Sequence, residues 1–309
     1  MKKWLMLVSL LMLAFVTACS MESPTDSSGT ETGSEENGDG EYTVGFSIST
    51  LNNPFFVTLQ EGAEAKAEEL GVNLVVLDAQ DDDAKQVSDV EDLVQRGVDV
   101  ILINPTDSAS VAAAVEVANG AGIPVITVDR DADAGDIVSH IASDNVAGGE
   151  MAAELLVELV GDGAKVAELE GIPGSSAARE RGEGFHNIAE GTLDVVSSQT
   201  ANFDRSEGLN VMENILQSNP DIVGVFAHND EMALGALEAI EAAGKGNDIV
   251  VIGFDATDDA VAAVEAGRMA ATVAQQPTLI GSSAVEAALN VLKGEQVEEN
   301  IPVQLELVK

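Results

Sequence analysis

The chain has 309 residues and a formal net charge of −40, because 54 acidic side chains stand against only 14 lysines and arginines. This balance argues against a nucleic-acid partner, whose phosphates require a basic surface. The single cysteine excludes an internal disulfide framework and a multi-cysteine metal site. We hypothesise that the acidity reflects a saline or alkaline habitat; the alternative is that acidic patches dock a basic partner.

Residues 1–19 are predicted to form a lipoprotein signal. A basic MKK start precedes the apolar run WLMLVSLLMLAFV, which is short for a membrane span, and VTAC then ends at Cys19. Cleavage before Cys19 and its lipidation are expected; the alternative is an ordinary secretory signal with an incidental cysteine. Residues 20–41, rich in Ser, Gly, Thr and acidic side chains, are predicted to be a flexible tether. The protein is therefore expected outside the cytoplasm, anchored to the cell membrane by lipid or free in the periplasm.

From residue 42 onward, apolar strand-like runs alternate with helical patterns. Strands are predicted at 42–48, 73–78, 98–104, 124–129, 164–170, 194–199, 221–227, 248–255 and 270–275. Helices between them include 56–70, 83–97 and 206–218. Near-continuous apolar strands that alternate with helices indicate parallel sheets covered on both faces. The roughly 270 residues of this body are enough for two α/β domains.

Polar side chains follow nearly every predicted strand. They are Ser49, Asn53, Asn104, Asp129, Arg130, Asn229, Asp255 and Gln275. In open parallel sheets, ligands bind beyond the carboxyl ends of the strands, so these side chains are candidate ligand contacts. The alternative is that each is a helix cap or a turn residue, because Asn, Asp and Ser are preferred there as well.

This set of side chains suits a hydroxyl-rich ligand. A carboxylate accepts hydrogen bonds from neighbouring hydroxyls, Arg donates in a planar fork, and Asn does one of each. Phe55 and Phe56 lie in a polar loop of an aromatic-poor chain, and Phe203 follows a later strand. We interpret the three rings as apolar surfaces for the faces of a sugar. Packing in the core at the start of a helix remains the alternative for Phe56.

At these residues the chain resembles the D-ribose-binding family, within the type I periplasmic sugar-binding proteins that feed ABC transporters. The resemblance covers about 42–309 and rests on the segments STLNNPFF (49–56), LINPTDS (102–108), VSHIASDN (138–145), SAARERGEGF (176–185), NDEMALGAL (229–237) and GFD (253–255). It implies two doubly wound parallel-sheet domains of Rossmann type, joined by a three-segment hinge that closes on the sugar.

The resemblance assigns sugar contacts residue by residue. They are Ser49, Asn53, Phe55, Phe56, Asn104, Asp129, Arg130, Arg181, Phe203, Asn229, Asp255 and Gln275. Three positions depart from the family pattern: His228 stands where Gln is usual, Ala256 where Gly is usual, and Gln276 where Leu is usual. These departures leave the ligand class intact and are candidates for tuning affinity.

The resemblance also implies domain boundaries. One lobe is expected to comprise 42–143 and 276–304, and the other 144–275 and 305–309. The chain is then expected to cross between them near Ser143 and Asp144, near Gln275 and Gln276, and near Gln304. Asn53 and Asp129 would face Asp255 and Arg181 across the cleft, and closure would exclude water from their hydrogen bonds.

The function implied is capture of D-ribose and its delivery to an ABC transporter permease, by a monomer without cofactor. Another monosaccharide, such as allose, galactose or a ribose-like signalling furanose, is the alternative ligand. A second alternative is that the loaded protein docks a chemotaxis receptor. The sequence of 129–136, DRDADAGD, departs from a calcium loop because Ala134 and His140 occupy its glycine and glutamate positions, so no metal is expected.

An enzyme is not expected. Asp129 and Asp255 form a pair of carboxylates such as glycoside hydrolysis uses. However, we expect their Arg and amide neighbours to keep both ionised, without a raised pKa. The chain also lacks a GxSxG segment and a phosphate loop, and its three histidines lack metal-ligand spacing.

Overall fold

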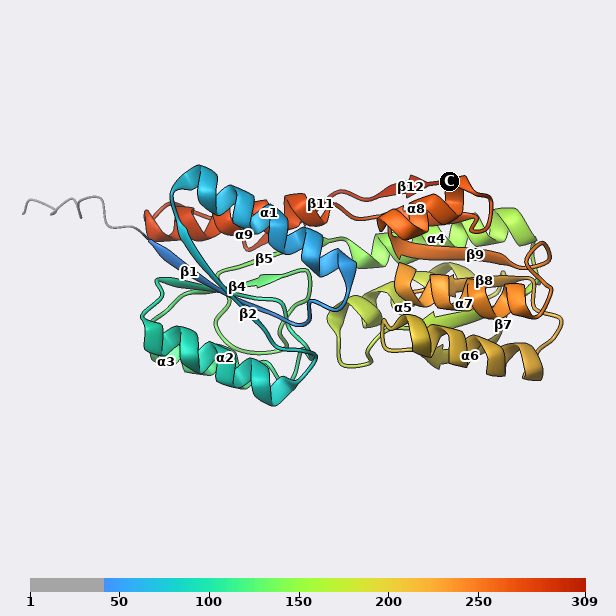
Figure 1. The fold of residues 1–309 in the computed structure, drawn as a ribbon, viewed down its shortest axis with the longest axis horizontal. Coiled ribbons are helices and arrows are strands. Elements are labelled where there is room, and N and C mark those ends of the chain that lie inside the picture. The colour runs from blue at the N-terminus through green and yellow to red at the C-terminus, as the bar shows by residue number, and fades with distance from the viewer. Residues whose placement is uncertain (1–41) are drawn as a thin grey trace, which may run out of the picture. The chain divides into compact units, whose positions relative to one another are not determined.

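The computed structural model describes residues 42–309, and the predicted signal, the lipidated Cys19 and the tether lie outside these residues. Two six-stranded sheets organise the described chain (Figure 1). All strand pairs are parallel except β10 with β12, the short last strand. The expected fold class, two α/β units built on parallel sheets, is confirmed.

The first sheet and its helices form what we call the N-terminal lobe. Its strand order is β11-β5-β4-β3-β1-β2. The strands are β1 (Thr43–Ile48), β2 (Asn73–Asp78), β3 (Val100–Ile103), β4 (Val125–Val128), β5 (Ser139–Ser143) and β11 (Asn300–Val303). The helices α1 (Pro54–Leu70) and α9 (Pro277–Leu292) cover one face, and α2 (Asp83–Arg96) and α3 (Ala112–Gly120) cover the other.

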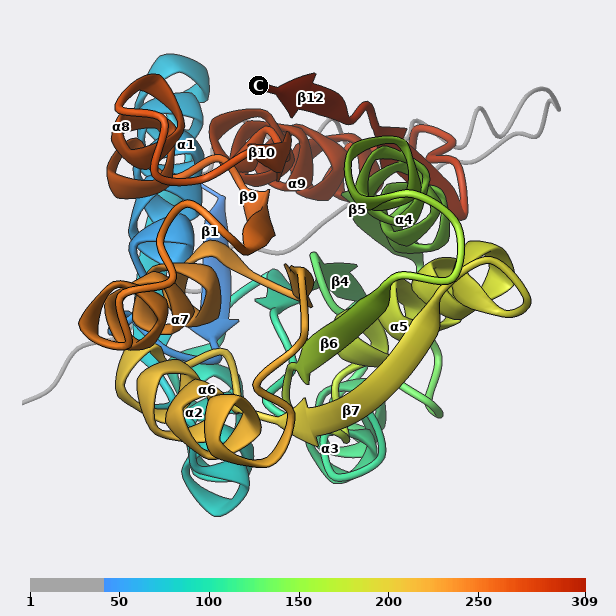
Figure 2. The ribbon, with the colours of Figure 1, turned by 90° about the vertical axis from the view of Figure 1, so that its right-hand side faces the viewer.

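The second sheet and its helices form the C-terminal lobe. Its strand order is β12-β10-β9-β8-β6-β7. The strands are β6 (Lys165–Glu170), β7 (Asp194–Thr200), β8 (Gly224–Ala227), β9 (Val250–Asp255), β10 (Ala271–Ala274) and β12 (Glu306–Val308). Figure 2 shows α4 (Asn145–Val160) and α5 (Ser176–Ala189) on one face, and α6 (Arg205–Ser218), α7 (Asp230–Ala242) and α8 (Asp258–Glu265) on the other.

The central strands are apolar because both of their faces are covered. Every residue of β3 (VILI), β4 (VITV) and β8 (GVFA) is buried. The sequence prediction missed three strands, β5, β11 and β12, and placed the start of α1 two residues late. Helix α1 begins at Pro54, whose fixed φ suits the first helical position. None of the helices described between 42 and 309 is long and apolar enough to span a bilayer.

Glycines allow neighbouring helices to pack unusually closely in three pairs. A Cβ at Gly149 of α4 would lie 2.2 Å from the carbonyl oxygen of Arg181 in α5, and one at Gly184 of α5 would lie 2.0 Å from that of Val146. The pairs α1 with α9 and α6 with α7 use glycines in the same way. Side chains larger than hydrogen at these positions would force the helices apart.

The chain passes between the two sheets at three places. It leaves the first sheet after β5 and enters α4, which packs on α5 of the C-terminal lobe. It returns after β10 into α9, which packs on α1, and it passes once more between β11 and β12. These connections bring the carboxyl ends of the two sheets to face each other.

Candidate functional site

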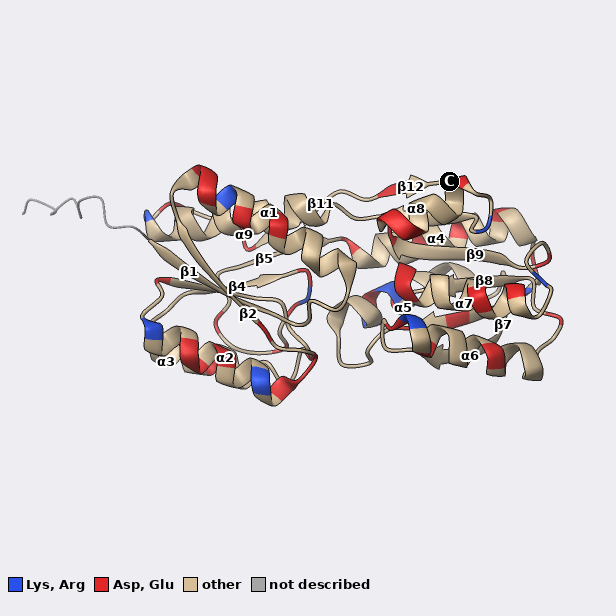
Figure 3. Cartoon of the chain, viewed as in Figure 1, with Lys and Arg blue, Asp and Glu red and all other residues tan. Residues whose placement is uncertain are grey.

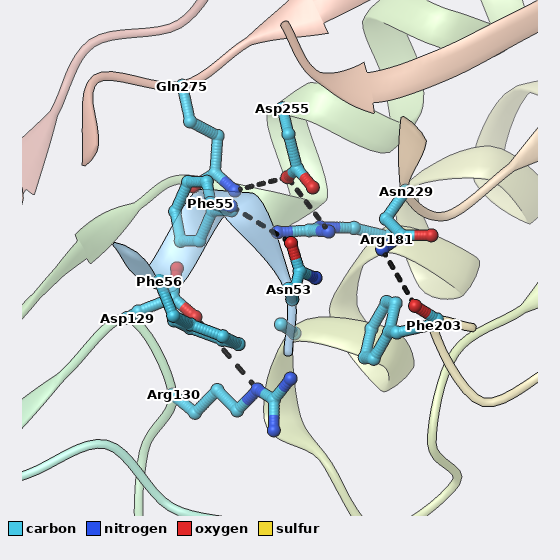
Figure 4. A pocket seen from close by; sticks show the side chains of 11 residues that line it. Asn53, Phe55, Phe56, Asp129, Arg130, Arg181, Phe203, Asn229, Asp255 and Gln275 are labelled. Carbon is cyan, nitrogen blue, oxygen red and sulfur yellow. Dashed lines mark hydrogen bonds and ion pairs between the residues drawn. The ribbon is translucent and has the colours of Figure 1, made fainter. Parts of the chain in front are cut away.

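A small cavity lies between the carboxyl ends of the two sheets. Figure 4 shows the side chains that line it, which converge from both lobes. The lining residues are Asn53, Phe55, Phe56, Asp129, Arg130, Ala177, Arg181, Phe203, Asn229, Asp255 and Gln275. The structure therefore brings together ten of the twelve side chains that the sequence predicted as ligand contacts.

Asn53 and Asn229 both line the cavity and cap helices. The side chain of Asn53 accepts from the Phe55 amide at the start of α1 (3.0 Å), and that of Asn229 accepts from the Met232 amide at the start of α7 (2.9 Å). The amide nitrogen of Asn229 also donates to the carbonyl of Phe203 (3.2 Å). Capping is thus confirmed at these positions, while ligand contact, which their place on the cavity wall allows, stays a prediction.

Aromatic rings from the two lobes flank the Arg130 guanidinium. Its central carbon lies 5.0 Å from the ring centre of Phe56 and 5.2 Å from that of Phe203. Phe55 packs edge-on against Phe56, with 5.2 Å between ring centres. Phe56 also belongs to the core of the N-terminal lobe, as the alternative interpretation held, and its contact with a sugar stays a prediction. The rings provide apolar surface on both sides of the cavity.

Arg181 is held by neighbours in the C-terminal lobe. Its Nε donates to the side-chain oxygen of Asn145 (2.9 Å), and one Nη donates to the carbonyl of His228 (2.6 Å). The same Nη lies 3.7 Å from a carboxylate oxygen of Asp255. The guanidinium also lies flat on Phe254, 3.9 Å from the ring centre. These contacts fix a cation at the wall of the cavity.

Some polar atoms at the cavity remain without partners among residues 42–309. Gln275 donates to Asp255 (2.8 Å), but its own buried side-chain oxygen has no hydrogen-bond partner there. The buried Nε of Arg130 is in the same situation. Because leaving such atoms unpaired is unfavourable, the cavity is suited to a ligand that carries both donors and acceptors.

Burial raises the pKa values of the two carboxyls in the cavity. It raises the pKa of Asp255 to about 7, although the nearby Arg181 opposes the shift. The pKa of Asp129 also rises through burial, against the opposing charge of Arg130. The expectation that Arg and amide neighbours keep both pKa values from rising was therefore wrong. The sequence cannot show that both groups lie deep between two lobes.

Ser49 and Asn104 lie behind the cavity rather than on its wall. The hydroxyl of Ser49 donates to the Asn104 side-chain oxygen (2.6 Å), and the amide nitrogen of Asn104 donates to the carbonyl of Val128 (2.9 Å). Both residues are fully buried. They link the ends of β1, β3 and β4, and so support the backbone from which Asp129 projects.

Left-handed backbone conformations occur at three lining residues. The φ angles of Asp129, Phe203 and Asp255 are 65°, 59° and 120°. Such conformations are unfavourable for residues with a side chain and gather at functional sites. Ala256, one of the departures from the family pattern, also has a positive φ, of 56°, which explains why glycine suits this position.

The residues predicted at the hinge lie at the three connections. Ser143 ends β5, and the side chain of Asp144 caps α4 by accepting from the Ala147 amide (3.0 Å). Gln276 precedes α9, and its side-chain nitrogen donates to the carbonyl of Gln304 in the third connection (3.0 Å). Two of the three connections are therefore hydrogen-bonded to each other.

Asp230 is a buried carboxyl close to the site that the sequence analysis did not select. It accepts hydrogen bonds from the Thr272 hydroxyl (2.7 Å) and the Thr257 amide (2.8 Å). Burial, together with the nearby Asp255, raises its pKa well above the ordinary value. In the sequence it follows Asn229 at a helix start, where acidic residues are common for other reasons. Among residues 42–309, no cluster of His, Cys, Asp and Glu is arranged to hold a metal ion.

The fold and the cavity define a two-lobed binding protein, and comparison with known families agrees. Residues 44–296 match the model of the periplasmic binding protein domain, so the chain belongs to that family. Members of this family act outside the cytoplasm. Membership in the family therefore places this chain outside the cytoplasm as well.

The particular relatives are ribose import binding proteins. The chain is 55% identical to "Ribose import binding protein RbsB" of Bacillus subtilis over 307 residues, 99% of each chain. It is 56% identical to the protein of the same name from Escherichia coli over 267 residues, which is 86% of this chain and 90% of that one. These relatives are solute-binding proteins, not enzymes.

Solved structures of related proteins contain other polyhydroxylated ligands. The Caulobacter myo-inositol binding protein, bound to myo-inositol, has a TM-score of 0.84 and 38% identity, covering 88% of this chain and 94% of that one. A solute binding protein from Actinobacillus succinogenes with bound D-allose has a TM-score of 0.82 and 34% identity, covering 87% and 98%. The type I periplasmic binding fold is therefore shared, while the ligands differ.

Proposed function

We propose that this protein captures D-ribose between its two lobes and delivers it to the permease of an ABC transporter. The observation that carries the proposal is the cavity, in which two carboxyls, two arginines and three amides lie between phenylalanine rings. The high identity to ribose import binding proteins favours ribose among the sugars that such a cavity accepts.

The side chains of the cavity complement the groups of a monosaccharide. Asp129 and Asp255 accept hydrogen bonds from sugar hydroxyls, and the two arginines donate to sugar oxygens. The rings of Phe56 and Phe203 contact the apolar C–H faces of the sugar. The ligand also supplies partners for the Nε of Arg130 and the side-chain oxygen of Gln275. Ser49 and Asn104 then contribute by supporting Asp129, rather than by touching the sugar.

Binding closes the two lobes around the sugar. The first lobe comprises 42–143 and 276–304, and the second comprises 144–275 and 305–309. The three connections, at Ser143 and Asp144, at Gln276 and at Gln304, absorb the rotation as a hinge. Closure removes water from the cavity, which strengthens each hydrogen bond to the sugar.

Outside the cytoplasm, the protein is anchored as a monomer by a lipid on Cys19, with 20–41 as the tether. Docking of the loaded protein to a chemotaxis receptor is a compatible second role. Fractionation of cells that express the parent and Cys19→Ser tests the anchor: the parent is expected with the membranes and the variant in the soluble fraction. A parent found only in the soluble fraction would contradict the anchor without affecting the sugar site.

Calorimetric titration of the protein tests the ligand. Binding of D-ribose at one site, with micromolar affinity or tighter, and much weaker binding of D-allose, D-galactose, D-glucose and myo-inositol, is expected. Preferential binding of D-allose or myo-inositol, which related structures contain, would overturn ribose as the ligand and keep the cavity as the site. His228, Ala256 and Gln276 would then be the first positions to exchange.

A further inference from the structure

A buried carboxylate and two histidines lie behind the wall of the cavity in the C-terminal lobe. Glu168 projects from β6 and is fully buried, and one of its oxygens lies 2.9 Å from Nε2 of His228. The other lies 3.0 Å from Nε2 of His186 on α5 and accepts from the hydroxyl of Ser198 on β7. None of these side chains lines the cavity.

The partners of His228 assign the tautomer of its imidazole. Its Nδ1 lies 3.3 Å from the backbone amide of Gly171, an N–H that can only donate, so Nδ1 accepts. Nε2 must then carry the proton of a neutral ring and donate it to Glu168. Burial tends to raise the pKa of Glu168, but the hydrogen bond from His228 holds that pKa below its ordinary value. A carboxylate therefore accepts from a neutral imidazole.

Each end of His228 is connected to a residue that lines the cavity. Its carbonyl accepts from Arg181 (2.6 Å), and the next residue along the chain is Asn229. Its Nδ1 holds the backbone of Gly171, and a Cβ on Gly171 would lie 2.1 Å from the Phe203 ring. His228 is thus connected to the three segments that carry Arg181, Phe203 and Asn229.

We propose that His228, held by Glu168, is a positioning residue that sets the geometry of Arg181, Phe203 and Asn229 and thereby the affinity for the sugar. The inference rests on the proposed function, because it concerns residues that support the cavity in which the sugar is proposed to bind. Helix α5 reinforces this support, since a Cβ at Gly182 would lie 3.3 Å from the imidazole. A side chain of similar size without polar atoms would leave one Glu168 oxygen and the Gly171 amide without the partner that His228 provides, and would release both segments.

Substitutions at His228 test the proposal by calorimetry with D-ribose. His228→Leu keeps the volume and removes both hydrogen bonds, so the affinity is expected to fall at least tenfold. His228→Gln offers one donor and one acceptor and is expected to recover most of the lost affinity. Wild-type affinity in a folded His228→Leu, or a Gln variant that binds no better than Leu, would overturn the proposal.

A control variant separates positioning from a general loss of stability. Ile240 is fully buried in the core of the same lobe, about three turns along α7 from Asn229. Ile240→Ala is expected to lower the melting temperature of the ligand-free protein and to change the affinity less than twofold. If it weakens binding as much as His228→Leu does at equal loss of melting temperature, the role of His228 is only structural and the proposal fails.

Combination with a change at Arg181 tests the connection to the cavity. If His228 acts partly through Arg181, His228→Leu should weaken binding less in an Arg181→Lys background than in the parent. Fully additive losses in the double variant would contradict this connection.

Nitrogen-15 spectra of the imidazoles test the arrangement without any sugar. The chain has only three histidines, so substitution assigns each signal. His228 is expected as the neutral Nε2–H tautomer, with an Nε2 proton signal that shifts in Glu168→Gln. The Nδ1–H tautomer would overturn the inference. A parent that shows the expected tautomer but binds no D-ribose would instead overturn the proposed function.

Discussion

Individual residues in this site serve the fold and the cavity at the same time. Asn53 and Asn229 cap helices with one side-chain atom while they line the cavity. Asp129 and Asp255 project into the cavity from left-handed backbone. A sequence shows that such residues follow strands, but it cannot separate capping from ligand contact, because the same residue types serve both purposes.

Arg181 is the residue whose loss should damage binding most directly. Arg181→Ala is expected to weaken the affinity for D-ribose at least tenfold, because it leaves buried hydroxyls of the sugar without a donor and removes the positive charge 3.7 Å from the Asp255 carboxylate. Calorimetry measures the change. Arg268→Ala is the control, since Arg268 pairs with Glu241 at the surface and should have no effect on affinity. Near-native affinity in a folded Arg181→Ala would remove Arg181 from the site.

The buried Asp255 should make the ligand-free protein less stable as the pH rises. An unfolded Asp titrates near its ordinary pKa of 3.8, whereas burial raises the pKa of Asp255 in the fold to about 7. The stabilisation that the protonated form provides is complete below about pH 4 and is lost as the pH rises through 7. The asparagine in Asp255→Asn cannot ionise, so this variant should avoid the loss. The loss amounts to at most about 4 kcal/mol in the free energy of unfolding.

Thermal unfolding of the ligand-free proteins measures this effect. The melting temperature of Asp255→Asn relative to the parent should be higher at pH 8 than at pH 4.5. The same variant should bind D-ribose more weakly, because an amide oxygen replaces a carboxylate. Asp248→Asn, at an exposed surface position, serves as the control and should show no such trend. A pH-independent difference for Asp255→Asn would contradict the prediction.

Among the elements, the close pairing of α4 with α5 determines where Arg181 lies. Arg181 projects from α5, and its Nε is held by Asn145 at the start of α4. The two helices approach closely at Gly149 and Gly184. The position of this proposed ligand contact therefore depends on a packing distance between helices that the sequence analysis did not anticipate.

Gly149→Ala should disturb both the fold and the site. The new methyl group would lie 2.2 Å from the Arg181 carbonyl, so α5 must move, at a cost of about 1–3 kcal/mol. The affinity for D-ribose should fall as Arg181 moves with its helix. Gly120→Ala at the end of α3 meets nothing within 4 Å and should be neutral or slightly stabilising. Equal stability and affinity in both variants would exclude a role for the close approach.

Most of the strands that the sequence predicted are central strands of the two sheets, while β2 and β7 are partly exposed strands at sheet edges. All nine predicted runs correspond to strands of the two sheets, and seven of them are central strands, which are apolar because helices cover both of their faces. The missed strands differ physically. β5 carries His140 and three serine or alanine residues, while β11 and β12 are short, partly exposed strands at sheet edges. The raised pKa values of Asp129 and Asp255 could not be predicted from the sequence. They arise because residues that are far apart in the sequence bury these carboxyls between the two lobes.

At the scale of the whole molecule, the negative charge should make stability depend on salt. The formal net charge is −40, and Figure 3 shows acidic residues over the outer helices of both lobes. Raising the ionic strength from 0.01 M to 1 M shortens the Debye length from about 30 Å to about 3 Å, which screens this repulsion. The melting temperature should therefore rise with sodium chloride.

A second salt distinguishes screening from specific binding of sodium. Tetramethylammonium chloride screens charge in the same way, so it should raise the melting temperature by a similar amount. A rise with sodium alone would indicate bound cations instead. A melting temperature unchanged between low and molar salt would show that self-repulsion contributes little to stability.

The two lobes also contact each other directly beside the cavity. The amide of Asp131 donates to the Ser176 hydroxyl (2.9 Å), and the amide of Ser176 donates to the Ser108 hydroxyl (3.1 Å). At the same edge, Arg179 of the C-terminal lobe pairs with Asp133 of the N-terminal lobe (3.0 Å). Such contacts stabilise the closed arrangement without touching the ligand, so they should contribute to affinity through the population of that state.

Arg179→Ala should therefore weaken D-ribose binding modestly. The pair with Asp133 is about half exposed, and exposed pairs contribute about 0.2–1 kcal/mol, so a loss of at most about fivefold is expected. Stopped-flow measurements should show the loss mainly as faster dissociation, because the pair forms only when the lobes close. Arg96→Ala removes a pair of similar exposure within α2 and should leave the affinity unchanged. Equal affinities for the two variants would mean that closure does not depend on this contact.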